Sequence, residues 1–200
     1  MKNAKKELRE KVLLKRDSLT REEIEQKSRL ILDKVQNLKS FGESNVIMSY
    51  VSFRSEVNTR MFINHCLELG KRVLVPAVVK KTGTGCKEII ASEISDPDKD
   101  LAIGTYGILE PRKESLREIN PYEIDFMVVP GTVFDKNCNR IGYGAGYYDR
   151  FMKKVKPECF KVGLAFQLQM VDELPSEEHD VPLDMVITER DVYLKRGFTL

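Results

Sequence analysis

The segment IGYGAGYYDRF, residues 141–151, has the residue types of a site that binds phosphate and a divalent cation. Gly142, Gly144 and Gly146 allow positive φ and lack Cβ atoms, so several backbone amides can point into one concavity. A helix is expected to follow, and the first amides of a helix also favour an anion. The spacing matches neither a Walker A loop nor the dinucleotide fingerprint, whose third glycine would stand at Tyr147. Spacing alone therefore leaves a plain strand-to-helix turn equally open.

Asp149 gives this segment a second chemical property. A carboxylate beside a bound polyphosphate is repelled unless a cation stands between them, and Mg²⁺ is usually held by one or two carboxylates together with phosphate oxygens. If phosphate binds here, Asp149 is therefore expected to be a magnesium ligand. Arg140, just before the run, could clamp a phosphate through two parallel hydrogen bonds, although a solvated turn charge is the alternative for this residue.

Two further stretches carry acidic residues beside predicted strands. LPSEEHDVPLD, residues 174–184, places His179 and Asp184 around two prolines, and a stiff acidic loop next to a strand is a common place for ligand-binding groups. SFRSEVNT, residues 52–59, places Glu56 just after a predicted strand. Exposed loop acids, with His179 hydrogen-bonded to backbone, remain the alternative for both stretches.

Helices and short apolar strands must position these groups. Apolar residues recur at helical spacing within 3–17, and Thr20 with Glu23 forms a capping box for a second helix. Further helices are expected over 59–69, capped by Thr59 and ended by Gly70, and over 147–155. The expected strands are 46–51, 72–79, 87–94, 126–134, 160–166 and 185–188.

The alternation of strands with helices predicts the fold class. It favours a mostly parallel sheet with helices on both faces. We therefore expect the α/β class, as a three-layer αβα arrangement around a mixed, Rossmann-like sheet. Residues 1–200 are expected to form a single domain, with the helices of residues 1–40 packed on the sheet.

Five strings occur in order along the chain: K-x-x-L-R at 5–9, the Ser52, Glu56, Val57 and Thr59 string, GILEP at 107–111, VPGTVFD at 129–135 leading into NRIGYGAGYYDRF, and HDVPLD at 179–184. Together they resemble the 5-formyltetrahydrofolate cyclo-ligase family, also called methenyltetrahydrofolate synthetase. Residues 139–151 are the most diagnostic of them. Ala145 stands where the family often has glycine, and its methyl group is compatible with the loop unless this position needs a positive φ.

The resemblance implies a ligase of folate and one-carbon metabolism with ATP and Mg²⁺ as cofactors. Members of the family convert 5-formyltetrahydrofolate to 5,10-methenyltetrahydrofolate and release ADP and phosphate. An amide oxygen is a poor leaving group, so the family phosphorylates the formyl oxygen first, and the second folate nitrogen then closes the ring. Phosphoryl transfer of this kind depends on positioning and charge stabilisation more than on covalent help from the protein.

The same resemblance assigns expected residues to each ligand. Glu56 suits the pterin because a carboxylate can accept two parallel hydrogen bonds from its amino-pyrimidine edge. Without the resemblance, Lys5 and Arg9 would be assigned to a solvated helix face. ATP is expected at Lys5, Lys6, Glu7, Leu8, Arg9, Arg140, Ile141, Gly142, Tyr143, Gly144, Ala145, Gly146, Tyr147 and Tyr148. Folate is expected at Val51, Glu56, Tyr143, Gly144, Ala145, Gly146 and Tyr147. Mg²⁺ is expected at Asp149 and Asp184, the catalytic residues are Arg140, Tyr147 and Asp149, and His179 is a further candidate.

Composition limits the other classes of function. The chain has 33 basic and 31 acidic residues, a net charge of +2 and a pI of about 8.2, which gives no reason to expect nucleic-acid or membrane binding. The first residues, MKNAKKELRE, are charged, so we expect no signal peptide; the sequence has no apolar run of about 18 residues, and its cysteines form no C-x-x-C pair. We therefore expect a cytoplasmic monomer whose partner is a small-molecule substrate.

A non-catalytic folate- or nucleotide-binding module on the same fold is the alternative function. The presence of both Asp149 and Asp184 favours the enzyme, because a metal pair is what separates the two functions. A nucleic-acid-binding protein, which the basic first helix would suggest, is disfavoured by the near-neutral overall charge.

Overall fold

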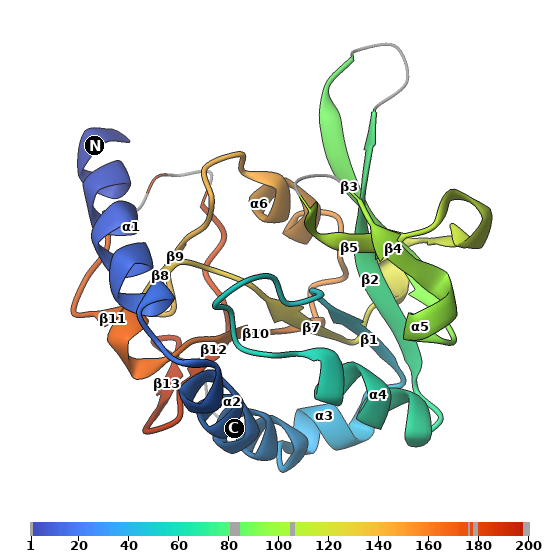
Figure 1. Ribbon diagram of the computed structural model, residues 1–200, viewed down its shortest axis with the longest axis horizontal. Coiled ribbons are helices and arrows are strands. Elements are labelled where there is room, and N and C mark those ends of the chain that lie inside the picture. The colour runs from blue at the N-terminus through green and yellow to red at the C-terminus, as the bar shows by residue number, and fades with distance from the viewer. Residues whose placement is uncertain (1, 81–84, 105–106, 176, 178–179, 198–200) are drawn as a thin grey trace.

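The computed structural model describes residues 2–80, 85–104, 107–175, 177 and 180–197 (Figure 1). Within these ranges the largest sheet has eight strands, in the order β13, β12, β10, β7, β1, β2, β3, β6. Their bounds, in that order, are Val192–Leu194, Met185–Ile187, Phe160–Leu164, Phe126–Val129, Val46–Ser49, Arg72–Lys80, Lys87–Ile94 and Glu118–Ile119.

The middle of this sheet is parallel and its edges are antiparallel. Strands β12, β10, β7, β1 and β2 run parallel to one another, whereas β13, β3 and β6 are antiparallel additions. All residues of β1 and β7 are buried, as expected for strands covered on both faces. The predicted α/β class, with a mostly parallel but mixed sheet, is confirmed.

Helices cover the two faces of the sheet unequally. Figure 1 shows α2, α3 and α4 side by side on one face, where the ring of Phe41 lies 5.4 Å from that of Phe62 and 5.8 Å from that of Phe126. The other face is covered by the short helix α6 and by the segment around Phe134. The predicted three layers are therefore present, with a thick helical layer on one face of the sheet and a thin layer on the other. The helices are α1 (Lys2–Asp17), α2 (Arg21–Gln36), α3 (Lys39–Glu43), α4 (Arg60–Glu68), α5 (Pro97–Asp100) and α6 (Tyr147–Met152), with 3₁₀ turns at Lys113–Ser115, Pro121–Glu123 and Gln167–Gln169.

A small second sheet supports α1. Val12 of α1 packs against Val133, Ile141 and Leu174, so the first helix lies over the segment that leads into the glycine run. This sheet consists of β11 (Met170–Val171), β8 (Val133–Asp135) and β9 (Arg140–Ile141), and a separate hairpin pairs β4 (Leu101–Ile103) with β5 (Leu109–Pro111).

Residues 126–134, predicted as one strand, form β7 and β8 in two different sheets. Pro130 and Gly131 separate them, and Thr132 N then donates to Ile141 O at 2.7 Å to begin the small sheet. A Cβ at Gly131 would lie 2.5 Å from the ring of Phe134, so a larger residue would force this turn to shift. The turn leaves residues 130–131 at the carboxyl edge of the main sheet.

Signals at the helix ends are mostly confirmed. Thr20 and Glu23 form the predicted capping box, with Glu23 N donating to Thr20 Oγ1 at 3.2 Å and Thr20 N donating to Glu23 Oε2 at 2.8 Å. Gly70, with φ of +72°, follows α4 as predicted.

The predicted cap at Thr59 is wrong in its chemistry. Thr59 does precede α4, but its hydroxyl donates to Tyr50 O at 2.7 Å and accepts from Ser52 N at 3.1 Å, rather than bonding to the first turn of the helix. The hydroxyl is hydrogen-bonded to the start of the loop that carries Glu56 and not to the helix. Thr59 therefore fixes the start of that loop.

Two further features bear on function. Within the described ranges, no helix combines the length and the apolar character needed to cross a membrane. Cys66, Cys138 and Cys159 are buried thiols, and burial raises the pKa of each to about 12. These three thiols therefore stay protonated and act as core residues rather than nucleophiles.

Candidate active site

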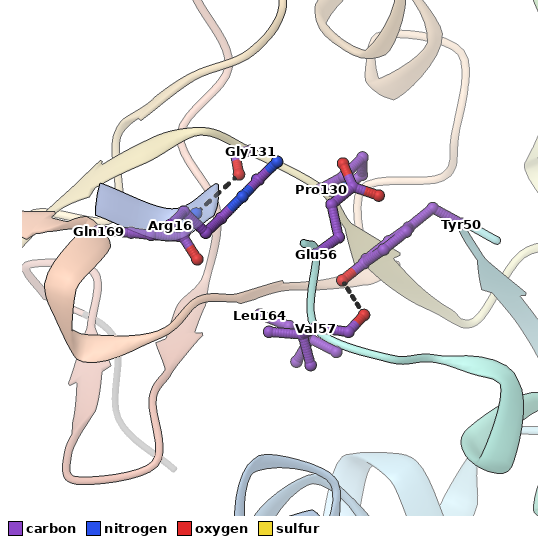
Figure 2. A pocket seen from close by; sticks show the side chains of 8 residues that line it. All are labelled: Arg16, Tyr50, Glu56, Val57, Pro130, Gly131, Leu164 and Gln169. Carbon is purple, nitrogen blue, oxygen red and sulfur yellow. Dashed lines mark hydrogen bonds between the residues drawn. The ribbon is translucent and has the colours of Figure 1, made fainter. Parts of the chain in front are cut away.

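A narrow crevice lies at the carboxyl ends of β1, β7 and β10 (Figure 2). Tyr50 follows β1, Pro130 and Gly131 follow β7, and Leu164 ends β10. Because these strands are parallel neighbours, their ends meet at one edge of the sheet, where open α/β sheets bind ligands. The crevice is lined by Arg16, Tyr50, Glu56, Val57, Pro130, Gly131, Leu164 and Gln169.

Hydrogen bonds fix the walls of the crevice. The Tyr50 hydroxyl donates to Val57 O at 3.1 Å, and Gln169 Nε2 donates to Gly131 O at 3.0 Å, as the dashed lines in Figure 2 show. Both Tyr50 and Gln169 are buried. The backbone on either side of the crevice is therefore held by buried side chains.

Glu56 is the acidic group of the crevice, and it lies beyond the carboxyl end of β1 as predicted. It is 7% exposed, with Oε2 accepting from Phe53 N at 2.9 Å and Oε1 accepting from the Tyr143 hydroxyl at 2.9 Å. Burial raises the pKa of Glu56, while the Phe53 amide, Arg16 and Tyr143 oppose the rise. A ligand that donates hydrogen bonds is therefore the natural partner of this carboxylate.

Arg16 and Tyr143 connect the crevice to the glycine run. Arg16, in the last turn of α1, is 1% exposed; its Nε donates to Ser55 Oγ at 3.0 Å and its Nη2 donates to the Tyr143 hydroxyl at 3.0 Å. Much of the Tyr143 ring is exposed, yet its hydroxyl reaches Glu56. The sequence reasoning missed Arg16. Its position seven residues after Arg9, on the same helical face, is the signal that could have found it.

The glycine run, residues 142–146, lies between β9 and α6. Gly144 and Gly146 have φ of +103° and +62°, whereas Ala145 lies outside the left-handed region, so its methyl group is compatible with the loop. Gly142 has a different environment: a Cβ there would lie 3.2 Å from Nη1 of Arg140, so a larger residue would require that side chain to move slightly. Positive φ is thus used at two of the three glycines.

Arg140 lies beneath this run, with a side chain that is 3% exposed. Its Nη2 donates to Asp149 Oδ1 at 3.0 Å, its guanidinium lies 5.8 Å from the centre of the Tyr148 ring, and its Nε has no partner among the described residues. Burial lowers the pKa of Arg140, and Asp149 opposes this change. A buried cation with an unpaired N–H is costly, and Nη1 of the same guanidinium lies next to Gly142 of the run.

The glycine run also forms one wall of an open hollow of about 240 Å³. Because α6 has only six residues, its dipole is small, and the positive charge of the hollow comes from Arg150 and Lys153. The sequence reasoning missed these two cations, although their spacing of three residues after the run marks one helical face. The hollow is lined by Gly144, Ala145, Gly146, Asp149, Arg150 and Lys153.

Two side chains of the predicted stretch 5–9 face the loops. Arg9 Nε donates to Gly142 O at 2.8 Å, and Lys5 Nζ pairs with Asp180 Oδ2 at 2.7 Å. Both cations therefore contact the loops rather than solvent alone, which was the alternative for them. The rest of the stretch is different: Lys6 and Glu7 are exposed, and Leu8 packs on the small sheet.

The two predicted metal ligands have different surroundings. Asp149 borders the hollow, whereas Asp184 immediately precedes β12, where its Oδ2 accepts from Lys161 N at 2.8 Å and from Lys161 Nζ at 3.4 Å. In the part of the chain that the structure describes, no group of three or more His, Cys, Asp or Glu side chains is placed to hold a metal ion. Asp149 alone fits a magnesium site made of one carboxylate and phosphate oxygens. His179 lies outside the described residues.

The remaining predicted contact residues surround these features. Val51 is 8% exposed and belongs to the core cluster, and Ile141 is buried beneath α1. Tyr148 packs in the core on both faces of the sheet, and burial raises its pKa far above the ordinary value. Tyr147 packs against the core below α6, with the Arg150 guanidinium 5.2 Å from the centre of its ring.

Sequence comparison relates the whole chain to one enzyme family. The model of the 5-formyltetrahydrofolate cyclo-ligase family matches residues 1–189. A Caenorhabditis elegans protein named probable 5-formyltetrahydrofolate cyclo-ligase is 31% identical over 203 residues, covering 97% of each chain. The 5-formyltetrahydrofolate cyclo-ligase of Haemophilus influenzae is 30% identical over 180 residues, covering 90% of this chain and 94% of the relative.

Solved structures show the same relationship. The NMR structure of Aquifex aeolicus 5,10-methenyltetrahydrofolate synthetase matches with a TM-score of 0.81 at 34% identity, covering 98% of this chain and 95% of that one. A 5,10-methenyltetrahydrofolate synthetase from Mycoplasma pneumoniae matches with a TM-score of 0.73 at 26% identity, covering 92% and 98%. Similarity in sequence and in fold thus extends over nearly the full length of each protein.

Proposed function

The chain belongs to the 5-formyltetrahydrofolate cyclo-ligase family and converts 5-formyltetrahydrofolate to 5,10-methenyltetrahydrofolate, and we propose that it does so with Mg-ATP bound at the glycine run. The observation that carries this proposal is the buried guanidinium of Arg140, whose Nε has no partner among the described residues, directly below a run with two left-handed glycines. A phosphate in the run would supply an acceptor for that nitrogen.

The cations around the run support triphosphate as the anion. Arg9 reaches the run from α1, Arg140 comes from the strand before it, Arg150 from α6, and Lys153 from the residue that follows α6. Transfer of a phosphoryl group is accelerated mainly by positioning and by stabilising charge on its oxygens. In this proposal Arg140 and Arg9 hold the phosphates, and Arg150 with Lys153 neutralise the side that is open to solvent.

Asp149 is proposed as the carboxylate that faces Mg²⁺. When bound, the ion would neutralise charge on the phosphate oxygens and hold them in a fixed orientation. Among the described residues, Asp149 is the carboxylate that pairs with Arg140 within 4 Å. An incoming phosphate can therefore replace Asp149 as the partner of Arg140, which leaves the Asp149 carboxylate for the cation. Asp184 remains the predicted second ligand, and a metal ion there would have to compete with Lys161 for its carboxylate.

Glu56 and the crevice are proposed to bind the pterin. The carboxylate would accept hydrogen bonds from the amino-pyrimidine edge, and Tyr143 of the loop and Tyr147 at the start of α6 would border both ligands. The formyl oxygen then attacks the terminal phosphorus of ATP, and ADP leaves. The second folate nitrogen attacks the formyl carbon and loses its proton, and the bond from that carbon to the phosphorylated oxygen breaks to release inorganic phosphate.

A direct optical assay tests the proposal. Purified protein is incubated with 5-formyltetrahydrofolate, ATP and Mg²⁺, and the methenyl chromophore is followed, with parallel reactions that lack ATP or contain excess EDTA. We expect a chromophore only in the complete reaction. Formation without ATP would contradict the phosphorylation route, and folate binding by calorimetry without any turnover would favour the non-catalytic binding module.

The assembly state and the cellular location stay predictions. We propose a cytoplasmic monomer that acts on a small-molecule substrate without nucleic acid or a membrane. Size-exclusion chromatography with light scattering checks the monomer, for which a mass near 23.0 kDa is expected.

A further inference from the structure

Arg16 is a buried cation whose hydrogen-bonding capacity is incompletely used. Its Nε and Nη2 are paired with Ser55 and Tyr143, but Nη1 has no partner among the described residues, although the residue is only 1% exposed. Buried polar atoms in native proteins are nearly always hydrogen-bonded, and exceptions often mark a functional site. Arg16 also lines the crevice, and Figure 2 shows it entering from a different element than Glu56.

The Tyr143 hydroxyl shows which ligand pattern this corner accepts. It accepts from Arg16 Nη2 at 3.0 Å and donates to Glu56 Oε1 at 2.9 Å, so a donor and an acceptor of the protein converge on one small group. A cyclic amide edge, –C(=O)–NH–, has the same two functions on adjacent atoms. The carbonyl accepts and the neighbouring N–H donates.

A 2-amino-4-oxopteridine carries such an edge. Its 4-oxo group is an acceptor, and the adjacent N3–H and 2-amino group are donors, which complements a guanidinium placed beside a carboxylate. The glutamate tail of a folate is a poorer candidate for Arg16, because a charged, hydrated tail has no reason to enter a crevice whose arginine is 1% exposed.

We propose that Arg16 is a specificity-determining residue, which donates hydrogen bonds to the 4-oxo group of the pterin while Glu56 accepts from N3–H and the 2-amino group. This assignment rests on the proposed function of the crevice. In a 2,4-diaminopteridine the 4-oxo acceptor is replaced by an amino donor, which would face the guanidinium and leave it unpaired. The crevice therefore selects 4-oxo over 4-amino pteridines through Arg16.

The crevice must open for this binding. Between its described lining residues there is no room for a water molecule, and the Tyr143 hydroxyl is hydrogen-bonded to both Arg16 and Glu56. The pterin would replace this hydroxyl and take over its two hydrogen bonds. Nη1 of Arg16 would gain a partner in the same step.

Equilibrium titration without ATP tests the assignment. The two probes are 5-formyltetrahydrofolate and its 4-amino-4-deoxy analogue, in which the 4-oxo acceptor becomes an amino donor and N3 loses its hydrogen. We expect the wild-type protein to prefer the 4-oxo compound by about tenfold or more, because the analogue leaves a buried donor unpaired. In Arg16→Met the preference should fall by about threefold or more, to the part that Glu56 and N3–H supply, and in Arg16→Lys it should be intermediate, because the charge stays but the second donor is lost.

Controls separate the possible failures. Lys15→Met, an exposed neighbour in the same helix, should keep the wild-type preference, and circular dichroism checks that each variant folds. If Arg16→Met does not fold, Arg16→Lys and the wild-type ratio decide. Equal wild-type affinity for both compounds, or an unchanged preference in the folded Arg16 variants, would overturn the assignment. A wild-type protein that does not bind 5-formyltetrahydrofolate at all would instead count against the proposed function.

Discussion

The hydroxyl of Tyr143 donates a hydrogen bond of 2.9 Å to the carboxylate of Glu56, 87 residues away in the chain. Tyr143 belongs to the glycine run and Glu56 to the crevice, so this one bond joins the proposed phosphate and pterin sites. If the pterin binds Glu56 as proposed, it displaces this hydroxyl and moves the middle of the glycine run. We expect the two ligands to influence each other's affinity through this bond.

Tyr143→Phe removes the group that competes with the substrate for Glu56. A hydrogen bond to a charged group contributes about 1.5–3 kcal/mol, so we expect the KM for 5-formyltetrahydrofolate to fall by about tenfold. Steady-state kinetics at saturating ATP measure this change, and Tyr122→Phe, at an exposed position, serves as the matched control. A raised KM would show that the hydroxyl contacts the substrate instead.

Glu56→Gln is expected to stabilise the fold at neutral pH. Because burial raises the folded-state pKa of Glu56 above its ordinary value of 4.5, ionised Glu56 costs folding free energy once the pH exceeds that raised pKa. The cost is absent below pH 4.5, where both states hold the proton. Urea unfolding at pH 7.5 and near pH 4.5 should show a gain for Glu56→Gln that shrinks at the lower pH. An equal gain at both pH values, or a similar gain in the exposed Glu158→Gln, would contradict this cause.

Asp149→Asn is expected to lower the turnover rate by more than about 100-fold while the fold is kept, because a metal ligand is lost without a change of volume. Initial rates over a range of Mg²⁺ concentrations, at fixed ATP, measure the effect. Asp184→Asn tests the predicted pair: a similar loss, with a shifted Mg²⁺ requirement, would support it. Loss of stability with an unchanged Mg²⁺ requirement would assign Asp184 to its ion pair with Lys161 alone.

Arg140→Ala is expected to raise the KM for ATP by about 10- to 100-fold and to change the KM for folate much less, because a charge-assisted contact to phosphate is removed. Arg21→Ala, on the exposed surface of α2, should change neither value. The opposite pattern in Arg140→Ala would exchange the ligands assigned to the two sites.

Gly144→Ala places a side chain at φ of +103° and a Cβ 3.5 Å from the guanidinium of Arg9. Strain of this kind costs about 1–3 kcal/mol, so we expect a weaker affinity for ATP, by about tenfold or more, as the loop shifts. Ala145→Gly is the matched control in the same loop and should bind ATP nearly normally, because Ala145 has an ordinary backbone conformation. Calorimetric titration with ATP and Mg²⁺ compares the two variants.

The main elements of the fold could be predicted because their signals are local. The capping box at Thr20 and the apolar runs of the central strands depend only on neighbouring residues. The division of 126–134 into two strands was missed although Pro130 and Gly131 form a local turn signal, because the apolar residues on both sides were interpreted as one run. The hydroxyl of Thr59 was misassigned for a different reason, since its partner is a loop that approaches only through tertiary structure.

The site was predicted in part, and the limit was again spatial. Spacing and residue type selected Glu56, Arg140 and the glycine run. Arg16 was not identified from the sequence, because an arginine in a charge-rich helix is usually solvated and only the fold buries it. The neighbour of Asp184 was equally hidden: Lys161 is 23 residues earlier in the chain and meets it only where β10 and β12 lie side by side.

Helix α1 carries both Arg9, at the glycine run, and Arg16, at the crevice. Seven residues separate them, which is two turns and about 10 Å of rise. The helix thus fixes the distance between the two proposed ligand sites. Inserting one residue between Arg9 and Arg16 would rotate one side chain relative to the other by about 100° around the helix axis. Only one of the two arginines could then contact its ligand. Natural variation in the length of this segment should therefore be confined to positions before Lys5 or after Asp17.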